Sequence, residues 1–313
     1  MRAFAIDEFG NSGSVHDEPT PEPEADQVRV KVEAAAVNPF DNVVLKGFLK
    51  DRMEHHFPLI PASDLSGTID SVGSGVDQWK VGDKVFGQTG KISIGHGSLA
   101  EFATASAGTI ARRPASIDPE LGAALPLAGV SALMCVEPMS LKRGDVVVVM
   151  GAAGGIGGFA VQMAKHAGAK VIAVTRKVNA DYVRGLGADE VVDYSTQDVV
   201  ETVRKAHRDG IAGVIHTAGD AETLGGLAAV VREGGHVVSM TGAAKVEDLA
   251  KRGVTGINVG TQVTTAALEK LAAMVDAGAV KRPQIKTFKL DQAGAAFEEI
   301  GTGHARGKLV IVP

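Results

Sequence analysis

Cysteine is almost absent from this chain of 313 residues, which contains only Cys135. A single cysteine excludes an internal disulfide and is typical of a reducing compartment, so we expect a cytoplasmic protein. It also excludes a zinc site built from several thiolates. The N-terminal segment reaches Asp7 and Glu8 before the apolar core of a signal peptide could form, so no secretion signal is expected.

An excess of positive charge is lacking as well. The 32 Lys and Arg residues are outnumbered by 37 Asp and Glu residues, giving a net charge of −5, which does not favour nucleic-acid binding. Residues 146–164 carry no charge and approach the roughly twenty residues that span a bilayer. Their glycines cluster where a strand would turn into a helix. A buried strand and helix explain this run, so we expect a soluble protein that does not enter membranes.

The same run contains the most informative motif of the chain. An apolar strand over residues 146–150 leads into a glycine-rich turn over residues 151–157. A helix follows as far as Gly168, and a second strand covers residues 171–174. This order is that of the unit which binds a dinucleotide pyrophosphate, because glycines admit the phosphates and the helix N-terminus attracts them. We predict dinucleotide binding; the alternative is a glycine-rich turn with only a structural role.

The residues after the second strand indicate which dinucleotide is bound. NAD sites usually carry Asp or Glu there, whereas this chain has Thr175, Arg176 and Lys177, with no carboxylate before Asp181. Two cations and a hydroxyl suit a 2′-phosphate, which an acid would repel. One charge-assisted hydrogen bond contributes roughly 1.5–3 kcal/mol, equivalent to a preference of at least about tenfold. We predict NADP(H); the alternative is that both cations are ordinary solvated loop charges.

Two kinds of architecture follow one another along the chain. Alternating apolar and polar residues predict short strands near residues 28–37, 66–76, 80–87 and 100–106, which is typical of a small antiparallel barrel. After Pro119, strands alternate with helices, which predicts a parallel, doubly wound sheet. Further buried strands are expected at residues 190–194, 213–219, 236–242 and 256–260, with helices near 198–207, 264–277 and 292–300 and strands near 285–290 and 308–312.

Several motifs occur in the order of a known family. They are NPFD (38–41), FPLIPASDLSGTI (57–69), VGDKVFG (81–87), AALPLAGVSAL (123–133), GAAGGIGGFAVQMAK (151–165), GADEVVDY (187–194) and GKLVIV (307–312). On these motifs the chain resembles the zinc-free quinone oxidoreductase branch of the medium-chain dehydrogenase/reductase superfamily.

The resemblance implies an α/β fold with two domains. A GroES-like β-barrel catalytic domain would comprise residues 1–122, a Rossmann NADP(H)-binding domain residues 123–262, and residues 263–313 would return to the catalytic domain. The cofactor would lie in the cleft between the domains. The resemblance also implies a homodimer in which the edge strand GINVG (256–260) pairs across a two-fold axis.

Departures from the zinc enzymes of the superfamily argue against a metal. Asn38 stands where those enzymes place a liganding cysteine, and Ala62, Ser63 and Asp64 stand in place of their Gly-His-Glu motif. Amide and hydroxyl oxygens are poor substitutes for thiolate and imidazole. The four-cysteine lobe is absent too, so we expect no catalytic or structural zinc.

The family pattern transfers binding roles to particular positions. The substrate pocket is predicted to contain Asn38, Phe40, Asp41 and Phe48. Cofactor-binding residues are predicted at Ser131, Ala153, Gly154, Gly155, Ile156, Gly157, Thr175, Arg176, Lys177, Tyr194, Thr217, Ala218, Ser239, Thr241, Val259, Gly260 and Thr261. His216, which ends a Rossmann strand, either lines the cofactor cleft or fills the sheet edge, and the second role is favoured.

Without a metal to polarise an alcohol, easily reduced acceptors become the expected substrates. The resemblance implies NADPH-dependent hydride transfer to a quinone or an α,β-unsaturated carbonyl. One alternative is an enoyl or acrylate-type reductase of a small carboxylate or thioester, for which Lys46, Lys50 and Arg52 are candidate anion partners. Another is a non-catalytic NADPH-binding protein. No catalytic residue is assigned, because Tyr182 and Tyr194 both fall on the adenosine side; water is the hypothesised proton source.

Overall fold

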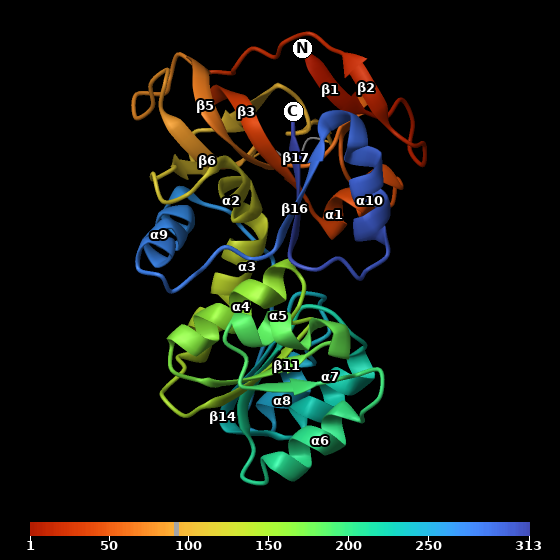
Figure 1. Cartoon of the computed structure of the whole chain (residues 1–313), viewed down its shortest axis with the longest axis vertical. Coiled ribbons are helices and arrows are strands. Elements are labelled where there is room, and N and C mark those ends of the chain that lie inside the picture. The colour runs from red at the N-terminus through yellow and green to blue at the C-terminus, as the bar shows by residue number, and fades with distance from the viewer. Residues whose placement is uncertain (91–93) are drawn as a thin grey trace. The chain divides into compact units, whose positions relative to one another are not determined.

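The computed structural model describes residues 1–90 and 94–313. Its chain divides into two compact units. Unit 1 consists of Met1–Leu127, Val263–Asp276 and Gln284–Pro313, and unit 2 of Ala128–Gln262 and Ala277–Pro283. Both chain termini belong to unit 1 (Figure 1).

Unit 1 consists mainly of strands. Its elements in chain order are β1 (Arg2–Ala5), β2 (Ser14–Asp17), β3 (Gln27–Val37), α1 (Pro39–Leu45), β4 (His55–Ile60), β5 (Asp64–Val72), β6 (Lys84–Gln88), β7 (Ile94–His96), β8 (Phe102–Ser106), β9 (Ile110–Arg112), α2 (Pro119–Ala124), α9 (Thr265–Asp276), β16 (Ile285–Lys289), the 3-10 helix η3 (Leu290–Gln292), α10 (Ala293–Gly301) and β17 (Lys308–Val312).

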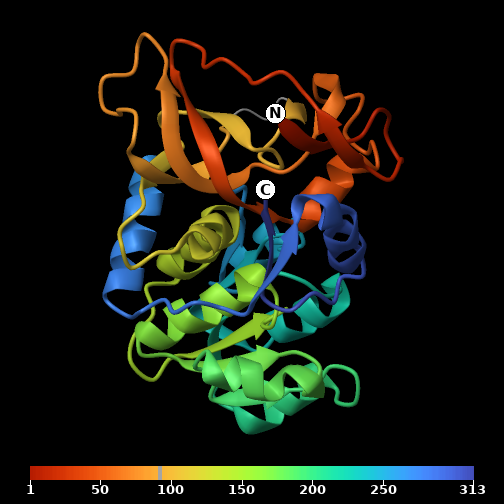
Figure 2. The same cartoon turned by 45° about the horizontal axis from the view of Figure 1, so that its top comes forward.

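The main sheet of unit 1 has seven strands. Six of them follow the order β16-β17-β3-β5-β6-β9, and β8 pairs with β3. Valines and charged residues alternate along the first half of β3, whose valines are buried, as expected of a strand with one face in the core. Most pairs are antiparallel, as predicted, but β16 and β17 are parallel. Parallel neighbours need a crossover, and α10 provides it. Figure 2 shows the strong curvature of these strands.

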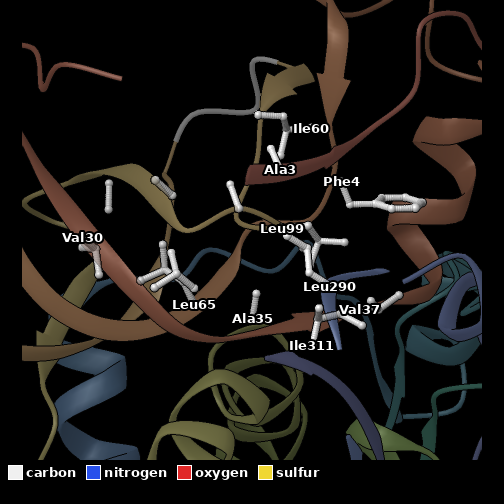
Figure 3. Close-up of a cluster of buried hydrophobic side chains, with 14 of the residues drawn as sticks. Ala3, Phe4, Val30, Ala35, Val37, Ile60, Leu65, Leu99, Leu290 and Ile311 are labelled. Carbon is white, nitrogen blue, oxygen red and sulfur yellow. The ribbon is translucent and has the colours of Figure 1, made fainter. Parts of the chain in front are cut away.

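The core of unit 1 draws on strands far apart in the sequence. Figure 3 shows Phe4 of β1, Val30 of β3, Leu65 of β5 and Ile311 of β17 in one cluster of buried side chains. The last strand of the chain therefore completes a core begun by the first.

Unit 2 alternates strands with helices. Its elements are α3 (Pro126–Val136, which begins in unit 1), η1 (Glu137–Met139), β10 (Val146–Met150), α4 (Gly155–His166), β11 (Lys170–Val174), η2 (Lys177–Asn179), α5 (Ala180–Gly185), β12 (Glu190–Val192), α6 (Val199–Ala206), β13 (Ile211–His216), α7 (Ala221–Ala228), β14 (Val231–Ser239), α8 (Val246–Ala250) and β15 (Thr255–Asn258).

The sheet of unit 2 is entirely parallel, in the order β12-β11-β10-β13-β14-β15. Val148, Ile172 and Val214 share a core cluster with residues of α6 and α7. The helix α4 packs against β10 and β11 with buried residues outside that cluster, so the helices cover both faces. The predicted α/β fold class, with a β-rich part and a doubly wound sheet, is confirmed.

The first division between the units falls after Leu127, compared with residue 122 in the sequence-based division. The reason is that α2 packs on unit 1: Ala123 and Ala124 lie in a cluster with Ala34, Ala36 and Val310. Residues 277–283 join unit 2 because the buried Gln162 side chain holds the Lys281 backbone. The Gln162 Oε1 accepts from the Lys281 N–H at 2.7 Å, and its Nε2 donates to the Lys281 carbonyl at 3.3 Å.

Candidate dinucleotide site and a buried charge network

The strand order of unit 2 creates a switch point between β10 and β13. The chain leaves β10 toward β11 on one side, while β13 lies on the other. Ligands of open α/β sheets bind where the strand order reverses, outside the carboxyl ends of the strands. The residues that follow β10 and β13 are therefore the candidate site.

The turn after β10 has the close-packed geometry that a pyrophosphate requires. Gly151 has φ +74°, a left-handed conformation that favours glycine. A Cβ atom on Gly157 would overlap the carbonyl oxygen of Gly151, so only glycine allows α4 to begin this close to the turn. Gly154 caps the helix without a side chain, and the next three residues present N–H groups that have no intrahelical acceptor. The turn and helix N-terminus thus form an anion cradle.

The loop after β11 presents two cations. Thr175 is buried, and its Oγ1 accepts from the Asn179 Nδ2 at 3.2 Å. Arg176 is half-buried and Lys177 is exposed, and neither forms an ion pair with any residue in the described ranges. The Lys177 backbone N–H bonds to Asp193, whose pKa is lowered mainly by hydrogen bonds from Ser195. That acid is therefore held by the backbone of the loop, and both cationic side chains remain available to a ligand.

The ends of β13, β14 and β15 hold further predicted cofactor residues. The Thr217 Oγ1 donates to the Met150 carbonyl at 2.8 Å, which ties β13 to β10. The hydroxyls of Ser131 and Thr261 lie 2.7 Å apart. Val259 donates its N–H to the Ser239 carbonyl at 2.9 Å.

The remaining predicted cofactor residues follow β10, β12, β13 and β15. Ala153, Gly155 and Ile156 belong to the turn and first turn of α4, while Ala218 and Gly260 are exposed in loops. Tyr194, which follows β12, is 49% exposed. The cofactor roles of these residues stay predictions.

Unit 1 buries a network of charged and amide side chains. The Lys308 Nζ donates to the Asn38 Oδ1 at 2.6 Å and lies 3.8 Å from the Asp64 Oδ2. The Asn38 Nδ2 donates to the same carboxylate at 2.9 Å. Asp64 also accepts from the Gln88 Nε2 at 2.8 Å and from the Leu127 N–H at 3.1 Å. Buried polar groups must be paired, and this network pairs each of these groups.

Asp41 adds a second buried carboxylate to this network. Its Oδ2 accepts from the Asn38 N–H at 2.7 Å at the start of α1. Burial raises the pKa of Asp41 to about 7, and the nearby Asp64 acts in the same direction. Burial also raises the pKa of Asp64, opposed by Lys308, whose own pKa burial lowers. When Asp41 is protonated, the carboxylate of Asp64 and the ammonium of Lys308 balance each other in charge.

The four predicted substrate-pocket residues therefore differ in exposure. Asn38 is 4% exposed, and both ends of its amide are bonded within the network. Asp41 is buried, whereas Phe40 is 46% and Phe48 is 72% exposed. Their role in a substrate pocket stays a prediction, in which the phenylalanines would contact the ligand and the polar pair would support α1.

Sequence reasoning missed Lys308 and Gln88 as members of the network. Lys308 was visible only as the first residue of a C-terminal strand, and no local signal links it to Asn38, 270 positions away. His216, expected to fill the sheet edge, is 1% exposed and bonds to Ser239, the last residue of β14, and to Gly219, which follows β13.

The described residues contain neither a cluster of metal ligands nor a membrane-spanning helix. No group of three or more His, Cys, Asp or Glu side chains that could hold a metal ion occurs in residues 1–90 and 94–313. Within the same ranges, none of the helices is both long and apolar enough to cross a membrane.

Unit 2 thus has the topology and the glycine turn of a dinucleotide-binding dehydrogenase domain. Comparisons with known proteins agree. Residues 24–115 match the alcohol dehydrogenase GroES-like domain family, and residues 186–311 match a family described as zinc-binding dehydrogenase.

Several relatives match the whole chain. A chloroplast envelope quinone oxidoreductase homolog of Arabidopsis thaliana is 32% identical, over 100% of this chain and 98% of that protein. An NADPH-dependent alkenal/one oxidoreductase of the same plant is 30% identical, over 100% and 80%. The solved quinone oxidoreductase of Coxiella burnetii is 30% identical, with a TM-score of 0.88 over 100% and 99% of the two chains. This chain belongs to the quinone oxidoreductase branch of the medium-chain dehydrogenase/reductase superfamily, which confirms the resemblance drawn from its motifs.

Proposed function

We propose that the protein is an NADPH-dependent oxidoreductase that transfers hydride to a quinone or an α,β-unsaturated carbonyl without a metal. The observation that carries the cofactor choice is the loop after β11, where Arg176 and Lys177 lack carboxylate partners among the described residues. The relatives named quinone oxidoreductase and NADPH-dependent alkenal/one oxidoreductase support the reaction class.

The residues of unit 2 fit the cofactor in chemical type. The glycine turn and the N-terminus of α4, which the close packing of Gly157 on Gly151 brings together, would hold the pyrophosphate. Arg176 with Lys177 would hold the 2′-phosphate. Bound NADPH supplies the hydride, so the protein's task is to orient the acceptor and exclude water. The exposed rings of Phe40 and Phe48 are suited to a flat, apolar acceptor.

The chemistry of unit 1 supports a reaction without zinc. Asn38, which stands where related zinc enzymes carry a ligand, already accepts a 2.6 Å hydrogen bond from Lys308. An ammonium group at this distance repels a divalent cation and occupies the amide oxygen. Easily reduced, conjugated acceptors need no Lewis acid, which agrees with the proposed substrates.

A homodimer and a cytoplasmic location complete the proposal. The strand β15 lies at the edge of the parallel sheet, and its residues are half-buried or exposed. An exposed edge can pair with a second copy. Size-exclusion chromatography with light scattering of the wild type and of Ile257→Lys tests this: a dimer that becomes monomeric supports edge pairing, and a monomeric wild type refutes it. Subcellular fractionation of cells that express the untagged protein tests the cytoplasmic location: recovery in the cytosolic fraction supports it, and recovery in an organelle or membrane fraction refutes it.

A steady-state panel tests the activity. NADPH and NADH are each combined with simple quinones, enals and 2-enoates. Turnover of quinones or enals with NADPH supports the proposal. Activity confined to 2-enoates favours the enoyl-type alternative, in which exposed Lys46, Lys50 or Arg52 would meet the carboxylate. NADPH binding without turnover of any acceptor refutes an enzyme and leaves a binding protein.

The cofactor assignment has its own test. Arg176→Ala removes one charge-assisted contact, worth roughly 1.5–3 kcal/mol, and should raise the KM for NADPH by at least about tenfold while changing that for NADH little. Arg204→Ala is the matched control, because this exposed arginine of α6 pairs with Glu201 at 3.5 Å. Equal losses for the two cofactors with Arg176→Ala would refute a phosphate role.

A further inference from the structure

His216 is a buried hydrogen-bonding centre between two loops. It ends β13 and is 1% exposed. Its Nδ1 lies 3.0 Å from the Ser239 Oγ and 3.2 Å from the Thr241 Oγ1, and its Nε2 lies 3.3 Å from the Gly219 carbonyl oxygen. One imidazole therefore joins the loop after β13 to the loop after β14, at the carboxyl edge of the parallel sheet.

The partners of the ring fix its tautomer. A carbonyl oxygen can only accept, so the Nε2 carries the hydrogen that is donated to Gly219. In the neutral ring, Nδ1 is then a single acceptor that faces two hydroxyl groups. Burial lowers the pKa of His216, opposed by the Gly219 bond and by the charge of the exposed Asp220. A protonated ring would turn Nδ1 into a donor and remove the acceptor that both hydroxyls share.

The hydroxyl of Ser239 is the better placed of the two donors. It lies 3.0 Å from Nδ1, compared with 3.2 Å for the Thr241 hydroxyl. It also accepts the N–H groups of Thr241 at 3.2 Å and Ala243 at 3.1 Å. The Ser239 Oγ also lies 3.3 Å from the Thr241 Oγ1. When Ser239 donates its proton to His216 and accepts two N–H groups, both of its lone pairs are used, so it cannot also accept from the Thr241 hydroxyl. The hydroxyl proton of Thr241 can then be donated outside the network.

We propose that His216 is a positioning residue for NADPH: it orients Ser239, which holds the loop after β14, and thereby leaves the Thr241 hydroxyl to donate to an acceptor atom of the bound dinucleotide. Because this inference rests on the proposed function, its test begins with wild-type NADPH binding. His216 itself would not contact NADPH. It would affect binding only through the Thr241 hydroxyl, which is why it is a positioning residue.

Four variants test the proposal by calorimetric titration with NADPH: two single changes, their combination and a conservative replacement. His216→Leu removes both ring nitrogens, and Thr241→Val removes the hydroxyl. Loss of one hydrogen bond, about 0.5–1.5 kcal/mol, should raise the Kd of each about three- to tenfold. The double variant should bind no more weakly than Thr241→Val alone, since both changes remove the same contact. His216→Asn, whose side-chain oxygen can replace Nδ1, should restore binding to within about threefold of wild type.

The control is His236→Leu. His236 is half-buried on β14 and pairs with Gly213, three residues before the His216–Ser239 pair. It should leave the NADPH Kd unchanged. If the wild type fails to bind NADPH, the proposed function falls. If it binds, but His216→Leu binds equally well or the two losses add, the positioning role of His216 is refuted and the function stands.

Discussion

Lys308 offers the sharpest test of how unit 1 is held together. Lys308→Met keeps the length of the side chain and removes the ammonium. The change removes the donor that bonds to the Asn38 side chain. It also removes the cation nearest to Asp64 among the described residues. Asn38 and Asp64 are both buried. Breaking a buried ion pair by removing one partner costs about 3–5 kcal/mol, because the other charge is left uncompensated.

The hydrogen-bond donors that remain around Asp64 determine where in this range the loss of stability should fall. Asp64 keeps hydrogen bonds from Gln88, Asn38 and Leu127, so the loss should fall near the lower end, about 3 kcal/mol. Lys286→Met is the matched control. Lys286 lies on the neighbouring strand β16 and bonds to Glu299 at 2.6 Å, but that pair is exposed. Exposed pairs contribute only about 0–1 kcal/mol.

The measurement follows denaturant unfolding through Trp79. This is the single tryptophan of the chain, and it is buried in unit 1, where its Nε1 donates to the Ala107 carbonyl at 3.1 Å. Its fluorescence therefore reports the unfolding of the unit that contains the mutation, even if the two units unfold separately. Adding Asp64→Asn to Lys308→Met should recover part of the lost stability. Equal losses for the Lys308 and Lys286 variants would show that burial of the charge is not what matters.

Three further predictions concern other residues of the two units. Asp41→Asn should flatten the pH dependence of stability: with a folded pKa near 7 and an ordinary unfolded pKa, the folded state holds an extra proton, so wild-type stability falls by on the order of 3 kcal/mol between about pH 5 and about pH 8. Denaturation of both proteins at the two pH values checks this, and a wild type that gains stability over this range contradicts it. Gly157→Ala should raise the NADPH Kd at least about tenfold by pushing α4 from the Gly151 carbonyl, whereas Gly225→Ala, with open space around it, should not; equal affinities would refute the cradle. Phe48→Ala should raise the KM of the acceptor several-fold without altering the NADPH Kd, and unchanged acceptor kinetics would remove Phe48 from the pocket.

The parts of the fold with strong local patterns were predictable from the sequence. The strand β10, the turn at Gly154 and the helix α4 follow from an apolar run that ends in glycines. The helix α7 was not predicted, because two glycines interrupt its short AETLGGLA sequence and tertiary packing of Leu224 and Leu227 decides its form. The strands β1, β2, β7 and β9 have only three or four residues and are too short to show a period. The longer strand β4 was not predicted because its sequence HHFPLI does not alternate polar and apolar residues.

The site was predictable only where its residues are consecutive. The loop from Thr175 to Lys177 could be recognised as a unit next to its strand. The network of Asn38, Asp64 and Lys308 could not, since its members come from three separate strands or strand ends and meet only in the folded sheet. The family motif predicts Asn38 near the substrate, and that role stays a prediction; its two buried side-chain hydrogen bonds could not be predicted from the motif.

The division of the chain between the units has a consequence for synthesis. Unit 2 is complete once residue 283 has been made, while unit 1 begins at Met1 and ends at Pro313. The strand β3 therefore lacks its β17 neighbour until the ribosome reaches the last residues. Asp41 and Asp64 likewise lack Lys308 until β17 has been made, and Lys308 is the only cation of their network among the described residues. The charges of unit 1 therefore balance only after β17 has been made, which is later than the last residue of unit 2.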